Sequence, residues 1–91
     1  MDFSIEYIAQ ELKEARLKKG LSQRALSEKV KIPQSHISNI EQGLVDLQIS
    51  SLIQLARTLE LEVMLVPRPL VMTVKAMQRP DNNEEPLYRI D

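Results

Sequence analysis

Apolar residues recur every three to four positions along the first sixty residues of the chain. This spacing is typical of amphipathic helices, which place one apolar stripe against a shared core. Serine, glycine and proline residues interrupt the pattern at positions suited to helix ends. The pattern predicts helices at residues 1–20, 22–30, 33–42 and 49–60, the second of them capped by Ser22. We therefore expect a mainly α-helical fold of four to five helices.

The second and third predicted helices are separated by a tight break at residues 31–33. On the third helix, Ile37, Ile40 and Glu41 share one face at about 100° per residue. Two short helices joined in this way are typical of a helix-turn-helix that enters a DNA groove. The face of the third helix opposite its isoleucines carries short hydrogen-bonding side chains, namely Gln34 at the tip, then Ser35, Ser38 and Asn39.

Residues 61–78 have a different pattern from the helical region. An apolar, partly β-branched run ends at Pro67, which predicts a short strand. A lone strand needs a partner because its backbone edges are open. Two partners are consistent with the sequence: residues 70–74 of the same chain, or the same strand of a second chain across a two-fold axis. The predicted strand consists of Glu62, Val63, Met64, Leu65 and Val66.

The composition becomes polar from Arg79 onward, with several Pro, Asp, Asn and Glu residues. Such a composition predicts a segment that does not pack. We therefore divide the chain into a helix-turn-helix DNA-binding domain at residues 1–60, a strand and dimerisation segment at 61–78, and a flexible polar tail at 79–91.

The charges are distributed unevenly along the chain. The net charge is −1 over 91 residues, which alone does not indicate a nucleic-acid partner. However, residues 13–31 contain seven basic and two acidic residues, whereas residues 43–91 contain five basic and seven acidic ones. The first half therefore has a local positive field, as a DNA-binding face requires. A solvated helix face would show the same charges, so the motif decides between these interpretations.

The chain lacks the residues from which most catalytic and metal sites are built. It has no cysteine and one histidine, and His36 has no second ligand three or four positions away. No Ser-His-Asp arrangement has a positioning context, and three aromatic residues are too few for a single-stranded nucleic-acid platform. No apolar run reaches the roughly 20 residues that span a bilayer. We expect a cytoplasmic, non-enzymatic protein that binds no cofactor, no metal and no membrane.

Residues from about 8 to 61 resemble the Xre/lambda-repressor-like helix-turn-helix family. This resemblance is carried by Leu21, Ser22, Gln23, Leu26, Val30, residues 33–41, Gly43, Leu52, Leu55, Ala56 and Leu59. The continuation at residues 61–66 resembles one subgroup, the HipB-like antitoxins, whose domain is followed directly by a strand that pairs with its mate. The resemblance implies a compact lambda-repressor-like domain with a short C-terminal β-strand that pairs in a dimer.

The resemblance also implies which positions read bases. Gln23 would contact a phosphate and brace Gln34, and Gln34 would make a bidentate contact to adenine N6 and N7. The other positions implied at the DNA are Ser35, Ser38 and Asn39, which read neighbouring base edges or phosphates, and His36 at the flank.

Further matching positions have structural or phosphate-binding roles. Arg16 and Glu41 match family positions that form a buried ion pair between the first and third helices. The loop at residues 44–48 departs from the family, because it carries Asp46 and no basic residue. The preceding basic region must then supply more of the phosphate contacts. The candidates, besides Gln23 and His36, are Lys18, Lys19, Ser22, Arg24 and Lys31.

Together these features predict a sequence-specific, dimeric repressor that binds an inverted-repeat operator in double-stranded DNA and is nucleoid-associated when bound. The HipB-like resemblance further implies an antitoxin that represses its own operon and binds a kinase-type toxin. Two alternatives remain open. One is a free-standing Xre regulator without a toxin partner. The other is a protein-interaction module that has lost DNA binding, which the acidic loop favours and the two glutamines Gln23 and Gln34 argue against.

Overall fold

The computed structural model of the chain describes residues 5–78. Five α-helices and one 3-10 turn follow one another in this range, and no strand occurs within it. The helices are α1 (Ile5–Lys18), α2 (Gln23–Val30), α3 (Gln34–Glu41), α4 (Ile49–Thr58) and α5 (Val71–Met77), and the turn is η1 (Arg68–Leu70). The prediction of a mainly helical fold is confirmed. Residues 1–4 of the first predicted helix and the predicted tail at 79–91 lie outside the described residues.

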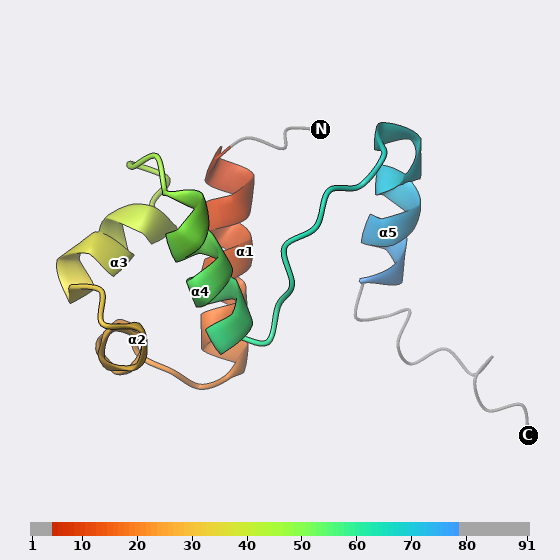
Figure 1. Cartoon of the computed structure of the whole chain (residues 1–91). Helices are drawn as coiled ribbons and strands as arrows, with labels where there is room; N and C mark the ends of the chain where they lie inside the picture. Colours follow the sequence, from red (N-terminus) through yellow and green to blue (C-terminus); the bar gives the residue numbers. More distant parts are fainter. Residues whose placement is uncertain (1–4, 79–91) are drawn as a thin grey trace, which may run out of the picture.

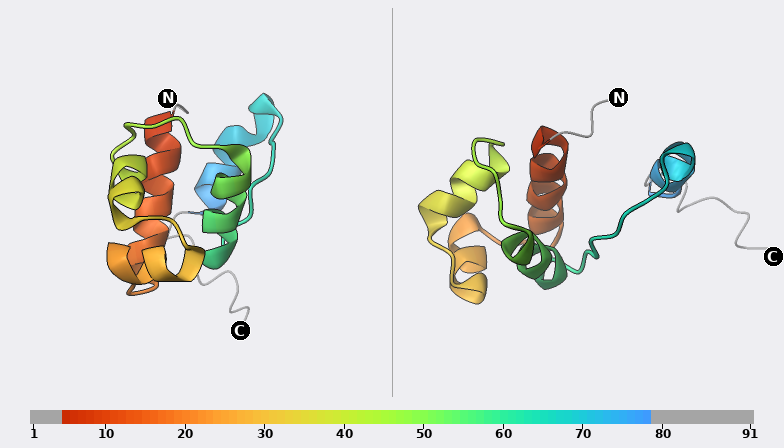
Figure 2. Two further views of the ribbon diagram at one scale, coloured as in Figure 1. Left: turned by 60° about the vertical axis from the view of Figure 1, so that its left-hand side comes forward. Right: turned by 45° about the horizontal axis from the view of Figure 1, so that its top comes forward.

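Helices α1 to α4 pack around one core, whereas α5 lies at the end of a long connection (Figure 1). The right-hand view of Figure 2 also shows α5 separated from the other four helices. Burial of apolar side chains is the main favourable term that holds such short helices together. All four helices of the body contribute to the core, which contains Leu12, Leu26, Val30, Ile37, Ile40, Leu55 and Leu59.

The N-terminal end of α1 is less buried than its apolar stripe predicted. Ile5 and Ile8 are 44% and 38% exposed, whereas Leu12, one and two turns further on, is buried. The two isoleucines line an open apolar pocket together with Leu47 and Leu52. No described element covers this end of the body, which leaves the first turns of α1 half in contact with solvent.

Interactions between residues close in sequence define both ends of α2. Ser22 is the N-cap, and its Oγ accepts a hydrogen bond of 2.9 Å from the Ala25 N–H. This satisfies one of the backbone donors that the first turn of a helix leaves unpaired. At the other end Lys31 adopts a left-handed conformation with φ 61°, and its N–H donates to the Ser27 carbonyl. The chain therefore turns sharply, and Ile32 packs against the core before α3 begins.

The third helix is shorter by one residue at each end than the predicted 33–42. Pro33 was expected as its first helical residue, but Pro33 has an extended ψ of 142° and is the N-cap. Its carbonyl accepts the first helical hydrogen bond, at 3.0 Å from the Ile37 N–H. The residue before a helix has this arrangement, so the helix begins at Gln34. Gly43, with φ 74°, follows the helix and reverses the chain.

The predicted strand at residues 62–66 is not formed in the single chain. Helix α4 ends at Thr58, and Glu60 follows in a left-handed conformation with φ 62°. The Leu61 N–H then donates to the Ala56 carbonyl at 2.7 Å, which closes the end of the helix. Residues 61–67 have no regular secondary structure.

The suggestion that residues 70–74 form a second strand is wrong. Leu70 belongs to the turn η1, and Val71 begins helix α5. The physical reason lies in the preceding prolines. Pro69 occupies the second position of η1, where a fixed φ near −65° suits a helical start and no N–H is required. The β-branched residues Val71 and Val74 favour strands only weakly, and this helical start overrides that preference.

Candidate nucleic-acid interface

Helix α3 separates its side chains into a buried face and an exposed polar face. Ile37 and Ile40 are 1% and 4% exposed and fix the helix in the core. Because both isoleucines lie on one side, the other side is free of packing constraints. Of the predicted contact residues on α3, Ser38 is half-buried, and the exposed ones are Gln34, Ser35, His36 and Asn39. The helix thus presents amide, hydroxyl and imidazole groups to solvent.

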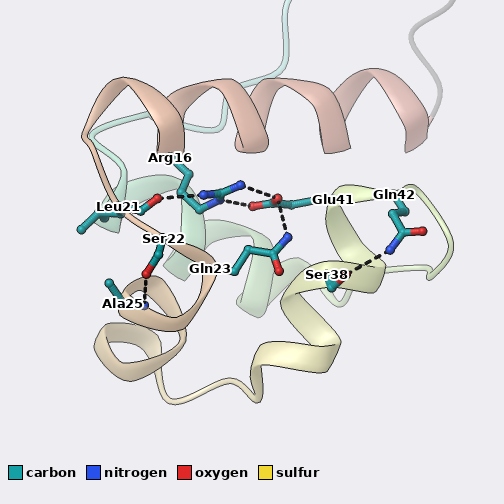
Figure 3. Close-up of polar contacts among 8 residues, drawn as sticks. All are labelled: Arg16, Leu21, Ser22, Gln23, Ala25, Ser38, Glu41 and Gln42. Carbon is teal, nitrogen blue, oxygen red and sulfur yellow. Dashed lines mark hydrogen bonds and ion pairs between the residues drawn. The ribbon is translucent and has the colours of Figure 1, made fainter.

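A buried ion pair fixes the position of α3 against α1 (Figure 3). Arg16 Nε donates to Glu41 Oε2 at 2.6 Å, and Arg16 Nη2 donates to Glu41 Oε1 at 3.0 Å. A third guanidinium nitrogen, Nη1, donates to the Leu21 carbonyl at 2.7 Å. The side chains of Arg16 and Glu41 are only 8% and 4% exposed. Such a bidentate pair restricts both distance and orientation, so α3 has one defined position relative to α1.

Gln23 joins this pair to α2. Its amide Nε2 donates to Glu41 Oε1 at 3.1 Å (Figure 3). The resemblance implied a contact between Gln23 and Gln34, but the described residues show no hydrogen bond to the Gln34 side chain. A carboxylate is a stronger acceptor than an amide oxygen, and Glu41 retains a free lone pair beside Arg16. Gln23 therefore fixes α2 to α3 through Glu41, and the Gln34 amide points to solvent without a fixed partner.

The sequence-based reasoning did not include Gln42 in the site. Its amide Nε2 donates to Ser38 Oγ at 3.0 Å, one turn back along the helix (Figure 3). Side chains four positions apart on a helix are neighbours, so this spacing was a usable signal in the sequence. The contact engages one acceptor position of the Ser38 hydroxyl and leaves its proton available to a partner.

Lys19 is oriented by an acidic residue at the end of α4. Its Nζ lies 2.7 Å from Glu60 Oε2. The hydrogen bond from Lys19, and then its positive charge, hold the pKa of the Glu60 carboxyl below its ordinary value. Lys19 was predicted to bind phosphate, but in the free protein it links the start of the α1–α2 connection to the left-handed residue after α4.

The remaining predicted phosphate ligands are on the surface. Arg24 Nε lies 3.7 Å from Glu28 Oε2, one turn along α2. This pair is solvent-exposed at both partners, so it restrains Arg24 only weakly. Lys18, Lys31 and the N-cap Ser22 are exposed as well. These groups are therefore accessible to a polyanion without a change in the core.

The loop after α3 brings an opposing charge to this surface. Asp46 is exposed, and Leu44 is 66% exposed, whereas Val45 and Leu47 pack against the core. A carboxylate near the end of α3 repels phosphates, so this loop offers no charge that would attract a polyanion.

The described residues offer little to a small ligand. No three His, Cys, Asp or Glu side chains between residues 5 and 78 come together as a metal-binding group. In the pocket beside Ile5 and Ile8, Asp46 is the one charged lining residue, and no convergent polar groups are present to orient a ligand. A search of the helices between residues 5 and 78 finds none long and apolar enough to cross a membrane.

Comparison with known proteins places the same residues in one family. A profile of a family described as helix-turn-helix matches residues 12–64. This range contains α2, α3 and α4 complete, together with Arg16, Gln23 and Glu41. No solved structure matches the chain significantly.

The chain is also similar to an uncharacterized HTH-type transcriptional regulator, y4dL, of Sinorhizobium fredii (strain NBRC 101917 / NGR234). The two are 40% identical over 75 residues, which cover 82% of this chain and 38% of the relative. The chain therefore spans less than half the length of that relative.

Proposed function

Because the chain belongs to the helix-turn-helix family of DNA-binding transcriptional regulators, we propose that it is a sequence-specific repressor that binds an inverted-repeat operator as a homodimer. One observation supports this most directly. The Arg16–Glu41 pair and Gln23 hold α3 rigidly, while the outer face of α3 keeps its hydrogen-bonding groups unburied. A rigid helix with free amides and hydroxyls suits the major groove, where each base pair offers a distinct pattern of donors and acceptors.

Gln34 is the principal base-reading residue in this proposal. It is the first residue of α3 and is exposed, and recognition helices contact base edges through their N-terminal residues. Its amide donates to N7 and accepts from N6 of adenine in a bidentate arrangement only if the amide nitrogen faces N7. Neighbouring edges or phosphates are contacted by Ser35, Ser38 and Asn39.

Phosphates are bound by the groups that flank α3. The candidates are Lys18, Lys19, Ser22, Gln23, Arg24, Lys31 and His36. Such contacts position the protein without reading sequence, and they make the affinity depend on salt. Lys19 takes part after exchanging Glu60 for phosphate, which is feasible because exposed ion pairs contribute little.

The homodimer in this proposal forms through residues 62–66, which pair as a strand with the same residues of a second chain. The backbone of residues 62–66 supports this pairing, because these residues belong to no helix or strand of the single chain. Two α3 helices related by a two-fold axis would then enter successive major grooves about 34–36 Å apart. The repressor acts in the cytoplasm, on the operator of its own operon.

The same repressor is the antitoxin of a HipBA-type pair in our fuller proposal. The support is the resemblance of residues 61–66 to the segment that follows the domain of HipB-like antitoxins. Co-expression of the chain with the product of the adjacent gene tests this, and co-purification with a kinase-type protein is expected. Failure of the two products to co-purify would leave a free-standing regulator.

A selection from random duplex DNA tests the base-reading role of Gln34. The wild-type protein is expected to enrich an inverted repeat. On that sequence, Gln34→Ala is expected to lose about 1–3 kcal/mol of binding free energy. Its base preference should also relax at one base pair in each half-site. Gln10→Ala is the matched control, because Gln10 is an exposed glutamine on α1. Unchanged affinity and base preference in Gln34→Ala would contradict the assignment of Gln34 as a base-reading residue.

A protein-interaction module that has lost DNA binding is the second candidate, and the exposed carboxylate of Asp46 favours it. A salt titration separates the two functions. A repressor loses affinity steeply as salt rises, whereas a module without DNA binding shows no affinity even at low salt.

A further inference from the structure

Gln42, the C-cap residue of α3, makes two hydrogen bonds to Ser38, one turn back along the helix. Its backbone N–H donates to the Ser38 carbonyl at 3.1 Å. Its side-chain Nε2 donates to Ser38 Oγ at 3.0 Å (Figure 3). The first bond fixes the point from which the Gln42 side chain extends, and the second directs the amide group to the hydroxyl. The two residues are therefore held together as one unit of α3.

This unit lies on the exposed face of α3. At about 100° per residue, Gln42 falls between Ser38 and Asn39 and opposite the side that carries the buried Ile37 and Ile40. Ser38 is half-buried and Gln42 is exposed. Both side chains thus belong to the surface that the proposed function places in the major groove.

The hydrogen bond from Gln42 decides which role of the Ser38 hydroxyl stays open. A serine hydroxyl donates one proton and accepts through two lone pairs. A serine inside a helix often donates to the backbone carbonyl four residues earlier, which here belongs to Gln34. Among the described residues Ser38 makes no such bond, and its oxygen is held by the Gln42 amide instead. One lone pair is thereby occupied, and the proton remains available to a partner.

Ser35 provides a contrast on the same face. It has Asn39 four positions later, as Ser38 has Gln42, but within residues 5–78 no hydrogen bond joins the Ser35 and Asn39 side chains. The Ser35 hydroxyl therefore stays free to donate or to accept. Only Ser38 is directed to one of the two roles by a neighbour.

We propose that Gln42 is a positioning residue for specificity, which fixes Ser38 as a hydrogen-bond donor so that Ser38 selects a base edge presenting an acceptor. In the major groove such acceptors are guanine N7 and O6, adenine N7 and thymine O4, whereas cytosine presents its N4 amino group. The Gln42 side chain acts through Ser38 in this role. The inference deepens the proposed repressor and rests on it.

Selection from random duplex DNA with the full chain tests the positioning role. Gln42→Met keeps the length of the side chain but cannot donate. It is expected to relax the base preference at one pair in each half-site and to bind the wild-type repeat about fivefold more weakly. Ser38→Ala should relax the same pair, and adding Gln42→Met to it should change nothing further. An effect of Gln42→Met at a different pair, or one that persists without the Ser38 hydroxyl, overturns the proposal.

Gln42→Glu tests the direction of the hydrogen bond, because a carboxylate accepts and cannot donate. The Ser38 hydroxyl would then donate to the new carboxylate and face the groove with its lone pairs. The preference is expected to change to a base that presents an amino group at the same place, cytosine N4 or adenine N6. A Gln42→Glu protein that keeps the wild-type preference overturns the proposal.

The added charge of Gln42→Glu needs its own control, since it repels phosphates whatever the sequence. Gln48→Glu places the same charge at an exposed residue, the N-cap of α4. It is expected to leave the base preference unchanged. A change of preference in Gln48→Glu equal to that in Gln42→Glu would assign the effect to charge and overturn the role of the hydrogen bond.

Two further outcomes separate this role from folding and from the repressor itself. The Gln42 side chain is exposed, so Gln42→Met is expected to melt at the wild-type temperature. A lower melting temperature together with relaxed preference at several pairs would indicate damage to α3 and overturn the positioning role. A wild type that enriches no sequence would disprove the proposed function and this role with it. An enriched repeat whose preference Gln42→Met leaves intact would disprove the role of Gln42 alone.

Discussion

Glu41 is the residue at which three helices meet. It belongs to α3, accepts two hydrogen bonds from Arg16 of α1, and accepts a third from Gln23 of α2. Charged groups are seldom buried unless they are paired and hydrogen-bonded. Here every polar atom of the pair has a role, and no buried side-chain nitrogen or oxygen among the described residues lacks a partner. The position of the proposed base-reading surface therefore depends on one carboxylate.

Removing either partner of the Arg16–Glu41 pair is expected to destabilise the fold severely. Arg16→Met or Glu41→Leu should each reduce the free energy of unfolding by about 3–5 kcal/mol, because the remaining charge stays buried without a partner. The double variant should lose clearly less than the sum, since no charge is left in the core. Chemical denaturation of the four proteins measures the cycle, with Lys13→Met, an exposed position of α1, as the control. Single variants that each cost below about 1 kcal/mol would contradict this account.

The Lys19–Glu60 contact gives a pH-dependent contribution to stability. The lowered pKa of Glu60 means that the folded state favours the carboxylate. The contribution is therefore present above the ordinary glutamate pKa and is lost as pH falls through the lowered value of the folded protein. NMR titration should place the Glu60 midpoint below that of the Lys19→Met variant. In addition, the difference in melting temperature between the two proteins should disappear in strong acid. A midpoint that Lys19→Met does not raise would assign the shift to another cause.

At the scale of elements, α3 is held by its ends as well as by its buried face. Pro33 begins the helix by accepting from the Ile37 N–H, and Gly43 ends it in a left-handed conformation with φ 74°. Gly20, after α1, has nearly the same φ of 73°. A Cβ at Gly43 would lie 3.2 Å from Glu6 Cγ, whereas a Cβ at Gly20 would have no neighbour within 4 Å. Substitutions at the two glycines therefore distinguish the cost of backbone strain from the cost of crowding a neighbouring side chain.

Gly43→Ala is expected to destabilise the protein more than Gly20→Ala. Both substitutions place an L-residue in the left-handed region, at about 1–2 kcal/mol each. Only in Gly43→Ala does the new Cβ also crowd Glu6, whose Cγ lies 3.2 Å from its position and must shift slightly. Thermal and chemical denaturation of both variants measure the difference. An equal loss of stability would show that Glu6 moves aside freely.

At the scale of the whole molecule, one body of four helices carries the α3 surface, and residues 61–78 extend from it (Figure 1). One α3 helix of eight residues contacts too few bases to select a single site in a genome. A dimer doubles the contacts and adds a fixed distance between half-sites. In the proposed homodimer, residues 61–78 and the α3 surface therefore depend on each other for function.

Half-site spacing is expected to matter strongly. Insertion of five base pairs at the centre of the enriched inverted repeat should place the half-sites on opposite sides of the duplex and reduce affinity to that of a single half-site. Titration of DNA fragments with the original and the lengthened spacer measures this. A protein that binds both fragments equally would not be reading the two half-sites as one rigid dimer.

Local features of this fold could be predicted from the sequence because they depend on neighbouring residues. The spacing of apolar residues along the chain predicted the four helices of the body, and Ser22 indicated where α2 begins. The separation of Ile37 and Ile40 from the polar residues of α3 also followed from the helical period alone. Helix ends were less certain, since Pro33 is a cap, and α5 formed where a second strand at residues 70–74 was one of two open alternatives.

The tertiary structure alone decided which distant groups meet. Gln23 binds Glu41, 18 positions away, and Lys19 binds Glu60, 41 positions away. Periodicity assigns a residue to a face, but it does not show which side chain of another helix faces it. The sequence by itself therefore determined that this chain is a helix-turn-helix with a polar face on its third helix. The resemblance implied the Arg16–Glu41 pair, but only the packing of four helices showed that Gln23 binds the same carboxylate, because the contacts depend on how the helices cross.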